Sequence, residues 1–200
     1  MVSRPPLKIG ILALQGAVEP HEIKLNQLGV ATVEVRNPEA LEGLDGIILP
    51  GGESTTMLRL LHLNHLWEPL KKFVTHKPSW GICAGAILLA KKVHSPEQSS
   101  LEALDIEVDR NAYGRQLHSF IGKLTPSAHW KNPDVVEGVF IRAPKFVRVY
   151  GSTQVLLSWE TDPVLVEEGH LLASSFHPEL TDSNQLHEYF LNKCSGAKEP

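Results

Sequence analysis

The residue with the clearest chemical potential is Cys83, which lies in the segment Gly81–Gly85 with the sequence GICAG. An apolar stretch precedes this segment and the apolar run 86–90 follows it, which predicts a strand, a sharp turn and a helix. We expect the two glycines to let the backbone take a strained turn and to leave space around the sulfur. The start of a helix favours the thiolate, the nucleophilic form of cysteine. The alternative is a buried cysteine that fills the core, which is the commoner state of a lone cysteine.

A cysteine nucleophile needs a base, and the best candidate is His177 in Ser174–Glu179, with the sequence SSFHPE. This segment follows the last apolar strand, and functional side chains gather at the carboxyl ends of parallel strands. If the segment is extended, His177 and Glu179 face the same way, so Glu179 can accept the imidazole N–H and set its tautomer. Taken alone, a surface His-Pro-Glu turn is the simpler interpretation. Together with Cys83, the pair predicts a Cys-His-Glu triad.

A third candidate segment is Pro50–Thr56, with the sequence PGGESTT, between a strand and a helix. Its backbone N–H groups can point at an anion or an oxyanion, and its glycines permit a peptide flip. It lacks the lysine of a Walker phosphate loop. A plain helix cap by Ser54 or Thr55 is the alternative, and both interpretations can hold.

The other histidines show no comparable pattern. Solvated or core positions are expected for most of them, and only His21 and His118 are left open. No role is assigned to Cys194, the second of the two cysteines.

The elements that position these residues alternate along the first half of the chain. Strands are predicted at 7–14, 31–36, 46–49 and 79–82, with helices at 17–28, 55–63 and 67–75. This order predicts a parallel sheet covered on both faces. Shorter strands are expected in the second half at 106–108, 120–124, 138–142, 154–159, 164–167 and 171–176, as antiparallel additions to the sheet, before a helix at 184–193.

Composition indicates an ordinary globular protein. The 200 residues are 42% hydrophobic and 21% charged with a net charge of −4, so neither a nucleic-acid partner nor a membrane partner is expected. The length fits one domain over 1–200, and we expect residues 1–6 and about 195–200 to be disordered. With two cysteines and no segment long enough for a signal or a membrane span, a cytoplasmic protein is predicted.

The three segments together resemble the class I (triad) glutamine amidotransferases. Five blocks narrow the resemblance to the PdxT family, the glutaminase subunits of pyridoxal 5'-phosphate synthase: Leu12–Ala17, Pro50–Met57, Arg110–Gln116, Phe140–Pro144 and Ser175–Leu180. The resemblance covers nearly the whole chain, from about Leu7 to Asn192.

This resemblance implies a flavodoxin-like α/β fold, a three-layer sandwich with a mostly parallel central sheet. It implies hydrolysis of L-glutamine to glutamate and ammonia, with delivery of the ammonia to a synthase subunit of the PdxS family, and no cofactor or metal. It makes Cys83 the nucleophile, His177 the base and Glu179 its orienter. The remaining roles it implies are the oxyanion-hole N–H groups of Gly52 and Ala84, glutamine contacts from Gly52, Glu53, Ser54, Arg110, Ile141 and Arg142, and a place near the partner face for Gln15.

The chain departs from the family pattern at Ile82, Ala86 and Pro20, none of which belongs to the predicted triad. Surface ion pairing is the alternative for Arg110 and Arg142. A cysteine peptidase, another amidotransferase subunit and a non-catalytic synthase-binding scaffold are the competing functions. The blocks Arg110–Gln116 and Phe140–Pro144 argue against the first two, and the intact triad argues against the third.

Overall fold

The computed structural model describes residues 7–110 and 119–196. The ends for which we predict disorder lie outside these ranges, except for Ser195 and Gly196, which end the last helix. His118 and residues 111–116 of the Arg110–Gln116 block also lie outside them. That residues 1–200 form a single domain stays a prediction.

Strands and helices alternate through the first half of the chain, as predicted. The elements are β1 (Lys8–Leu12), α1 (Val18–Gln27), β2 (Ala31–Val35), a 3₁₀ helix (Pro38–Leu41), β3 (Gly46–Leu49), α2 (Ser54–Leu63), α3 (Trp67–His76), β4 (Ser79–Ile82) and α4 (Ala84–Leu89). The second half contains β5 (Ala90–His94), β6 (Leu104–Asp109), β7 (Phe120–Lys123), β8 (Thr125–Pro126), β9 (Glu137–Phe140), β10 (Lys145–Val149), β11 (Gln154–Trp159), β12 (Asp162–Glu168), β13 (Leu171–Ser174), a second 3₁₀ helix (Pro178–Leu180) and α5 (Gln185–Ser195).

The main sheet has eight strands in the order β2-β1-β3-β4-β13-β12-β11-β8. The strands from β2 to β13 pair in parallel, whereas β12, β11 and β8 extend the sheet in antiparallel fashion. The predicted mostly parallel sheet with antiparallel additions is therefore confirmed. The strands expected at 106–108, 120–124 and 138–142 do not join it, however, because β6, β7 and β9 lie in other sheets, and the strand expected at 171–176 pairs in parallel with β4. Strands β4 and β13 are neighbours, with Ile82 opposite Ser174.

Two further sheets are smaller than the main one. Three strands of the structure, β5, β8 and β10, are not predicted from the sequence. Strands β10, β6 and β5 form one sheet, and β7 pairs with β9 in the other. Strand β5 follows α4 directly, where the prediction has no strand, and it pairs in parallel with β6. Strands β5, β8 and β10 are set by pairing with other strands, so the local sequence is a weak guide to them.

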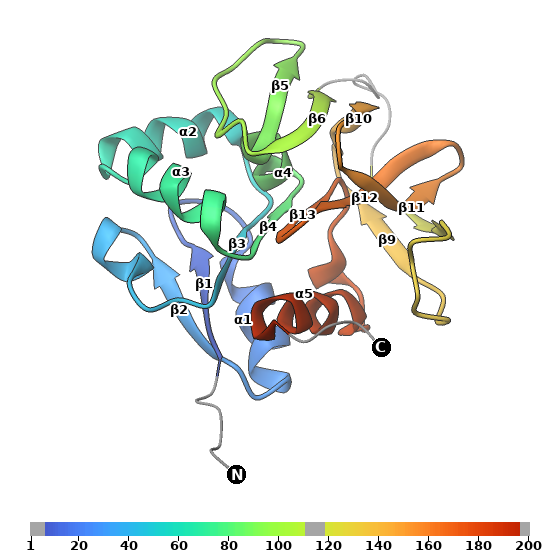
Figure 1. Cartoon of the computed structure of the whole chain (residues 1–200), viewed down its shortest axis with the longest axis horizontal. Coiled ribbons are helices and arrows are strands. Elements are labelled where there is room, and N and C mark those ends of the chain that lie inside the picture. Colours follow the sequence, from blue (N-terminus) through green and yellow to red (C-terminus); the bar gives the residue numbers. More distant parts are fainter. Residues whose placement is uncertain (1–6, 111–118, 197–200) are drawn as a thin grey trace.

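Helices cover both faces of the main sheet, which makes three layers (Figure 1). On one face the core contains Met57 and Leu61 of α2, Leu70 and Val74 of α3, and the apolar residues of α4. On the other face it contains Leu25 of α1 together with Leu186 and Phe190 of α5. Helices α1 and α5 thus share one face although they lie at opposite ends of the chain.

The departure at Pro20 fits the start of α1. Pro20 is the third residue of the helix, and the N–H groups of a first helical turn have no partner inside the helix. A proline there removes no intrahelical hydrogen bond. The helix therefore continues undisturbed into His21, which is fully buried.

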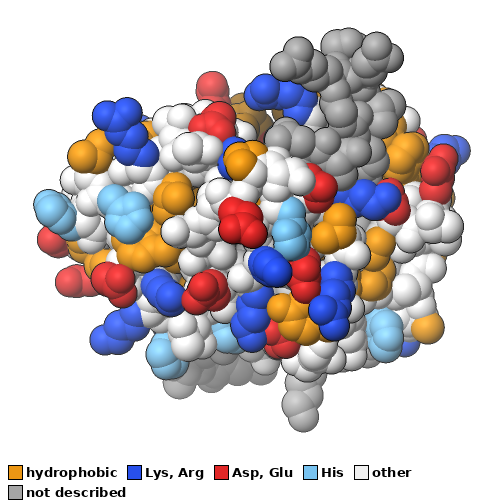
Figure 2. All heavy atoms as spheres, turned by 90° about the horizontal axis from the view of Figure 1, so that it is seen from above, with side chains coloured by type: hydrophobic (Ala, Val, Ile, Leu, Met, Phe, Trp, Pro, Cys, Tyr) orange, Lys and Arg blue, Asp and Glu red, His pale blue; other side chains and the backbone are white. Residues whose placement is uncertain are grey.

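The outer surface carries charges of both signs. Figure 2 looks down on the molecule from the top of Figure 1, and acidic and basic side chains are interspersed on this face. Among the described residues, every helix is too short or too polar to cross a membrane.

Candidate active site

Cys83 joins β4 to α4 in a backbone conformation that is rare for a residue with a side chain. Its φ is 50° and its ψ is −103°. The Cys83 N–H donates to the carbonyl of Ser174 on β13 at 2.8 Å, and the Cys83 carbonyl accepts from Ile87 at 3.2 Å. Neighbouring elements thus hold the strained residue on both sides, which is what lets such a conformation persist. The side chain lies at the start of α4 and is only 7% exposed.

The two flanking glycines serve close packing rather than the strained turn. The expected strained turn is present, but its positive φ occurs at Cys83 itself and at neither Gly81 nor Gly85. A Cβ on Gly81 would lie 2.5 Å from the carbonyl oxygen of Gly85, and a Cβ on Gly85 would overlap the carbonyl of Leu49. The glycines therefore let α4 approach the backbones of β4 and β3.

His177 and Glu179 follow β13, the strand beside β4. The His177 N–H donates to the carbonyl of Val139 at 2.8 Å, and Pro178 begins a 3₁₀ helix. The predicted extended segment is therefore wrong, because the fixed φ of Pro178 starts a helical turn instead. The predicted contact is nevertheless present, with Nδ1 of His177 2.7 Å from Oε1 of Glu179. A carboxylate there keeps the proton on Nδ1 and leaves Nε2 for Cys83.

The surroundings of His177 stabilise its protonated form. Burial lowers the pKa of His177, but the hydrogen bonds and charges of Cys83 and Glu179 outweigh it and raise the pKa to about 10. A protonated imidazole is therefore favoured beside the sulfur at neutral pH.

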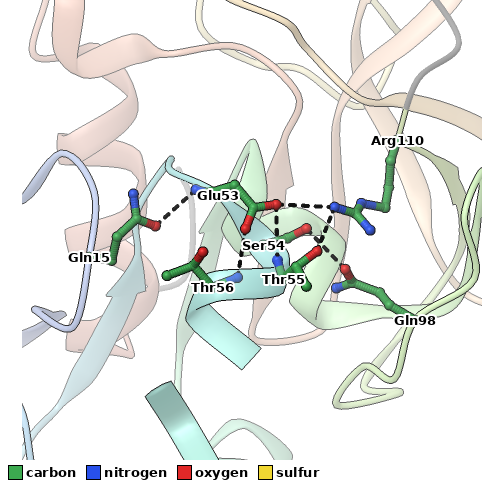
Figure 3. Close-up of polar contacts among 7 residues, drawn as sticks. All are labelled: Gln15, Glu53, Ser54, Thr55, Thr56, Gln98 and Arg110. Atoms are coloured by element: carbon green, nitrogen blue, oxygen red, sulfur yellow. Dashed lines mark hydrogen bonds and ion pairs between the residues drawn. The ribbon is translucent and has the colours of Figure 1, made fainter. Parts of the chain in front are cut away.

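The loop between β3 and α2 is held by the loop between β1 and α1. The Ala17 N–H donates to the carbonyl of Gly51 at 3.2 Å, and the Glu53 N–H donates to Oε1 of Gln15 at 2.9 Å (Figure 3). A Cβ on Gly52 would lie 2.6 Å from that Gln15 oxygen. Gln15 therefore contacts the segment expected to hold the oxyanion. No signal in the sequence indicates the part played by Ala17, because its contact is made by the backbone.

The residue that caps α2 is Glu53, so the alternative of a cap by Ser54 or Thr55 is wrong. The Glu53 carboxylate accepts from the N–H groups of Thr55 at 3.2 Å and Thr56 at 2.6 Å. Burial raises the pKa of Glu53, but these hydrogen bonds outweigh it and lower the pKa below its ordinary value. The longer side chain reaches back over the first turn, which leaves the Ser54 hydroxyl free to donate to Gln98 at 3.1 Å.

Arg110 reaches the same loop from the end of β6. Its guanidinium lies 3.3 Å from Oε1 of Glu53 and donates to the hydroxyl of Thr55 at 2.9 Å (Figure 3). Ile141 and Arg142 follow β9, and Arg142 has a φ of 45°. Arg142 forms no ion pair with any residue in 7–110 or 119–196.

One cavity of about 420 Å³ gathers nearly every residue singled out from the sequence. Those that line it are Gln15, Gly52, Glu53, Ser54, Cys83, Arg110, Ile141, Arg142, His177 and Glu179. The exception is Ala84, which is buried as the first residue of α4 directly after Cys83. Ile82 and Ala86, two of the departures, are apolar and fully buried in the two core clusters. The cavity is thus built from the carboxyl ends of β1, β3, β4 and β13.

The sequence indicates no role for His21 and predicts a solvated or core position for His187. The structure buries both completely on the side of Glu179 away from the cavity.

Comparison with known proteins gives a consistent family. The SNO glutamine amidotransferase family matches residues 11–196. The chain is 47% identical over 189 residues to a pyridoxal 5'-phosphate synthase subunit PdxT of Solibacter usitatus, which covers 93% of this chain and 98% of that protein. It is 49% identical to the PdxT subunit of Koribacter versatilis over 96% of this chain and 100% of that protein.

A solved structure agrees with these relatives. The crystal structure of a glutamine amidotransferase, 44% identical in sequence, superposes with a TM-score of 0.86 over 94% of this chain and 98% of its own. With the family matched over most of the length and close relatives covered nearly end to end, this chain belongs to the SNO glutamine amidotransferase family.

Proposed function

We propose that this protein hydrolyses L-glutamine to L-glutamate and ammonia, and supplies the ammonia to a synthase subunit of the PdxS family that makes pyridoxal 5'-phosphate. The observation that carries the proposal is the hydrogen-bonded pair His177–Glu179 beside Cys83 in one cavity. The relatives are PdxT subunits of pyridoxal 5'-phosphate synthase, which supports this acceptor for the ammonia.

In this mechanism the Cys83 thiolate attacks the carboxamide carbon of glutamine. The C=O π electrons move to oxygen, and the N–H groups of Gly52 and Ala84 stabilise the resulting oxyanion. His177 gives its proton to the leaving nitrogen, so that ammonia departs and a thioester remains. His177 then takes a proton from water, whose oxygen attacks the thioester. Collapse of the second tetrahedral intermediate restores the thiolate facing a protonated His177 and releases the γ-carboxylic acid, which gives its proton to water and becomes glutamate.

The cavity also contains side chains of both charges, which suit the α-carboxylate and the α-ammonium group of glutamine. Arginine binds a carboxylate in a forked geometry, so Arg110 and Arg142 are proposed to hold the α-carboxylate. The carboxylate of Glu53 lies beside Arg110 and suits the α-ammonium group. Gly52, Ser54 and Ile141 complete the proposed contacts with the substrate.

The loop that contains Gly52 suggests how a partner controls the reaction. The Gly51 carbonyl accepts from Ala17, so the Gly52 N–H points away from the loop between β1 and α1, since a trans peptide sets the two groups on opposite sides. Rotating this peptide breaks one hydrogen bond, a cost of about 1 kcal/mol. We propose that the synthase subunit binds near Gln15 and selects the peptide orientation in which the Gly52 N–H faces the oxyanion.

We also propose a cytoplasmic location. The free thiols Cys83 and Cys194 fit a reducing setting of this kind.

The test measures glutamate release from L-glutamine by the purified chain, alone and with increasing concentrations of a PdxS-family synthase subunit. Little activity is expected alone and a large increase with the partner. A chain that releases no glutamate in the complex contradicts the proposed function.

The variant Gly52→Ala tests the proposed control by the synthase subunit separately. The Cβ of Gly52→Ala would displace Gln15 and Met57, so this variant should lose more activation than partner binding in an isotherm measured alongside. Equal activity with and without the synthase contradicts this control and leaves the glutaminase assignment standing.

A further inference from the structure

Behind the predicted triad lies a pair of buried histidines that the mechanism does not use. His21 comes from α1 and His187 from α5, and Nδ1 of His21 lies 3.0 Å from Nε2 of His187. The other nitrogen of His21, Nε2, faces Oε2 of Glu179 at 3.6 Å. All three side chains are nine-tenths buried or more. The triad therefore continues inward as His177, Glu179, His21 and His187.

The positions of the protons in this chain of residues are restricted. Oε1 of Glu179 binds His177, whereas Oε2 is buried without a hydrogen-bond partner among the described residues. A neutral imidazole has one N–H. If His21 carried it on Nδ1, the lone pair of Nε2 would face the carboxylate oxygen and repel it. If His21 carries it on Nε2, the N–H dipole faces the oxygen, and Nδ1 accepts from His187.

We propose that His21 is a positioning residue for the triad: a neutral imidazole with its proton on Nε2, which orients the Glu179 carboxylate, while the Nε2–H of His187 fixes that tautomer. The proposal rests on the proposed function, because it assigns His21 a part in that reaction. His21 does not touch the substrate cavity, so its effect passes through Glu179.

The surroundings keep both rings neutral and in place. Burial lowers the pKa of His21 well below its ordinary value, helped by the nearby His187 and His177. Burial, with the charge of Lys24, lowers the pKa of His187 to about 3. The indole of Trp80 packs edge-on against both rings, with centroids 6.3 Å from His21 and 5.1 Å from His187. These side chains do not form a metal centre, since no metal-binding group of three or more His, Cys, Asp or Glu occurs in the described part of the chain.

Helix α1 also holds the segment that follows Glu179. The buried Lys24 donates from Nζ to the carbonyl of Thr181 at 2.6 Å and to that of Ser183 at 3.3 Å. His21 and Lys24 lie one turn apart, so the same face of α1 contacts Glu179 and the backbone beyond it. The position of Glu179 therefore depends on how α1 and α5 pack on the sheet.

The first experiment observes the tautomers directly and needs no activity. Nitrogen-15 spectra of the full chain labelled at histidine, assigned with His21→Gln and His187→Gln, distinguish Nδ1–H, Nε2–H and doubly protonated rings. The expected result at pH 7 is a neutral Nε2–H form for both His21 and His187. A proton on Nδ1 of His21, or a protonated His21, overturns the proposal whatever the protein catalyses.

The second experiment measures kcat and KM for glutamine in the complex with the synthase subunit. His21→Gln keeps an amide N–H near the place of Nε2, whereas His21→Leu removes it and keeps a similar volume. His21→Leu should lower kcat about tenfold to a hundredfold with little change in KM. His21→Gln should keep most of the wild-type kcat. His129→Leu, at an exposed site, is the matched control.

Coupling to Glu179 separates positioning from a general loss of structure. In a Glu179→Gln background, His21→Leu should lower kcat by a much smaller factor than in the wild type, because the oriented carboxylate is already gone. Equal losses in both backgrounds, or equal losses for His21→Gln and His21→Leu, overturn the proposal. Unfolding curves accompany each variant, and if His21→Leu does not fold, the tautomer spectra decide. A wild-type complex that releases no glutamate contradicts the proposed function instead and leaves the spectra as the separate test.

Discussion

Acidification should weaken the folded state through His187, and the substitution His187→Gln should remove that effect. In the unfolded chain His187 binds a proton below its ordinary pKa of 6.5, whereas burial in the folded protein lowers the pKa to about 3. Between these values the unfolded chain holds the extra proton, so stability falls as the pH falls. The contribution of His187 to the free energy of unfolding is fully present above about pH 6.5 and is lost progressively toward pH 3.

The size of the effect follows from the same two values. Each pH unit well inside this window favours the unfolded chain by about 1.4 kcal/mol for one such group. Between pH 7.5 and pH 5 the loss through His187 is therefore roughly 2 kcal/mol, allowing for its gradual onset near 6.5. His21 adds a loss of the same sign, because burial lowers its pKa too. His177 acts in the opposite direction, because its raised pKa stabilises the folded state as the pH falls from 7.5 to about 6.5; below that it is protonated in both states and adds little. This contribution is common to the wild type and His187→Gln.

Urea unfolding at pH 7.5 and pH 5, at constant ionic strength, gives the free energy of unfolding at each pH. His187→Gln should lose roughly 2 kcal/mol less than the wild type over this interval, even if it is less stable at both pH values. His129→Gln, at an exposed position, should behave like the wild type. The reasoning is refuted if His187→Gln and the wild type lose the same free energy, since His187 then binds its proton equally in both states.

Three further predictions concern the triad and its support. Cys83→Ala should reduce glutamine hydrolysis by at least about a thousandfold while circular dichroism stays native, and activity near the wild type would remove Cys83 as nucleophile. Glu179→Gln should lower kcat in the complex less than His177→Asn, because Glu179 orients the ring that carries the proton; the reverse order means the roles are misassigned. Gly85→Ala should destabilise the chain by about 3 kcal/mol and lower activity, because its Cβ would overlap the rigid carbonyl of Leu49, and an unchanged urea midpoint contradicts this.

Much of the fold can be predicted from the sequence because its signals are local. Apolar runs such as 46–49 and 79–82 lie between turn residues, and both are strands with those bounds. Strands β5 and β10 escape prediction because they pair with β6 and carry exposed side chains. Pairing of this kind depends on residues outside the segment itself, which a local pattern does not record.

In the candidate site, too, the features with a local sequence signal could be predicted and the others could not. Cys83, His177 and the Gly51–Gly52 loop can be picked out from the sequence because each stands in a short motif at the end of a strand. Their approach could be expected once a parallel sheet was predicted, since the carboxyl ends of its strands meet at one edge. The conformations were not predictable: the positive φ belongs to Cys83 rather than to its glycines, and Pro178 starts a 3₁₀ turn.

By itself, the sequence therefore determined the chemical groups, their order and the sheet that brings them together. Only the tertiary structure decided what lies behind Glu179. His21 and His187 are 166 residues apart and meet because α1 and α5 pack side by side on one face of the sheet. A histidine on a helix has the same local pattern whether it faces water or a buried carboxylate. Which of the two it faces is set by the packing of the helices, because burial and proton position depend on every element around the ring.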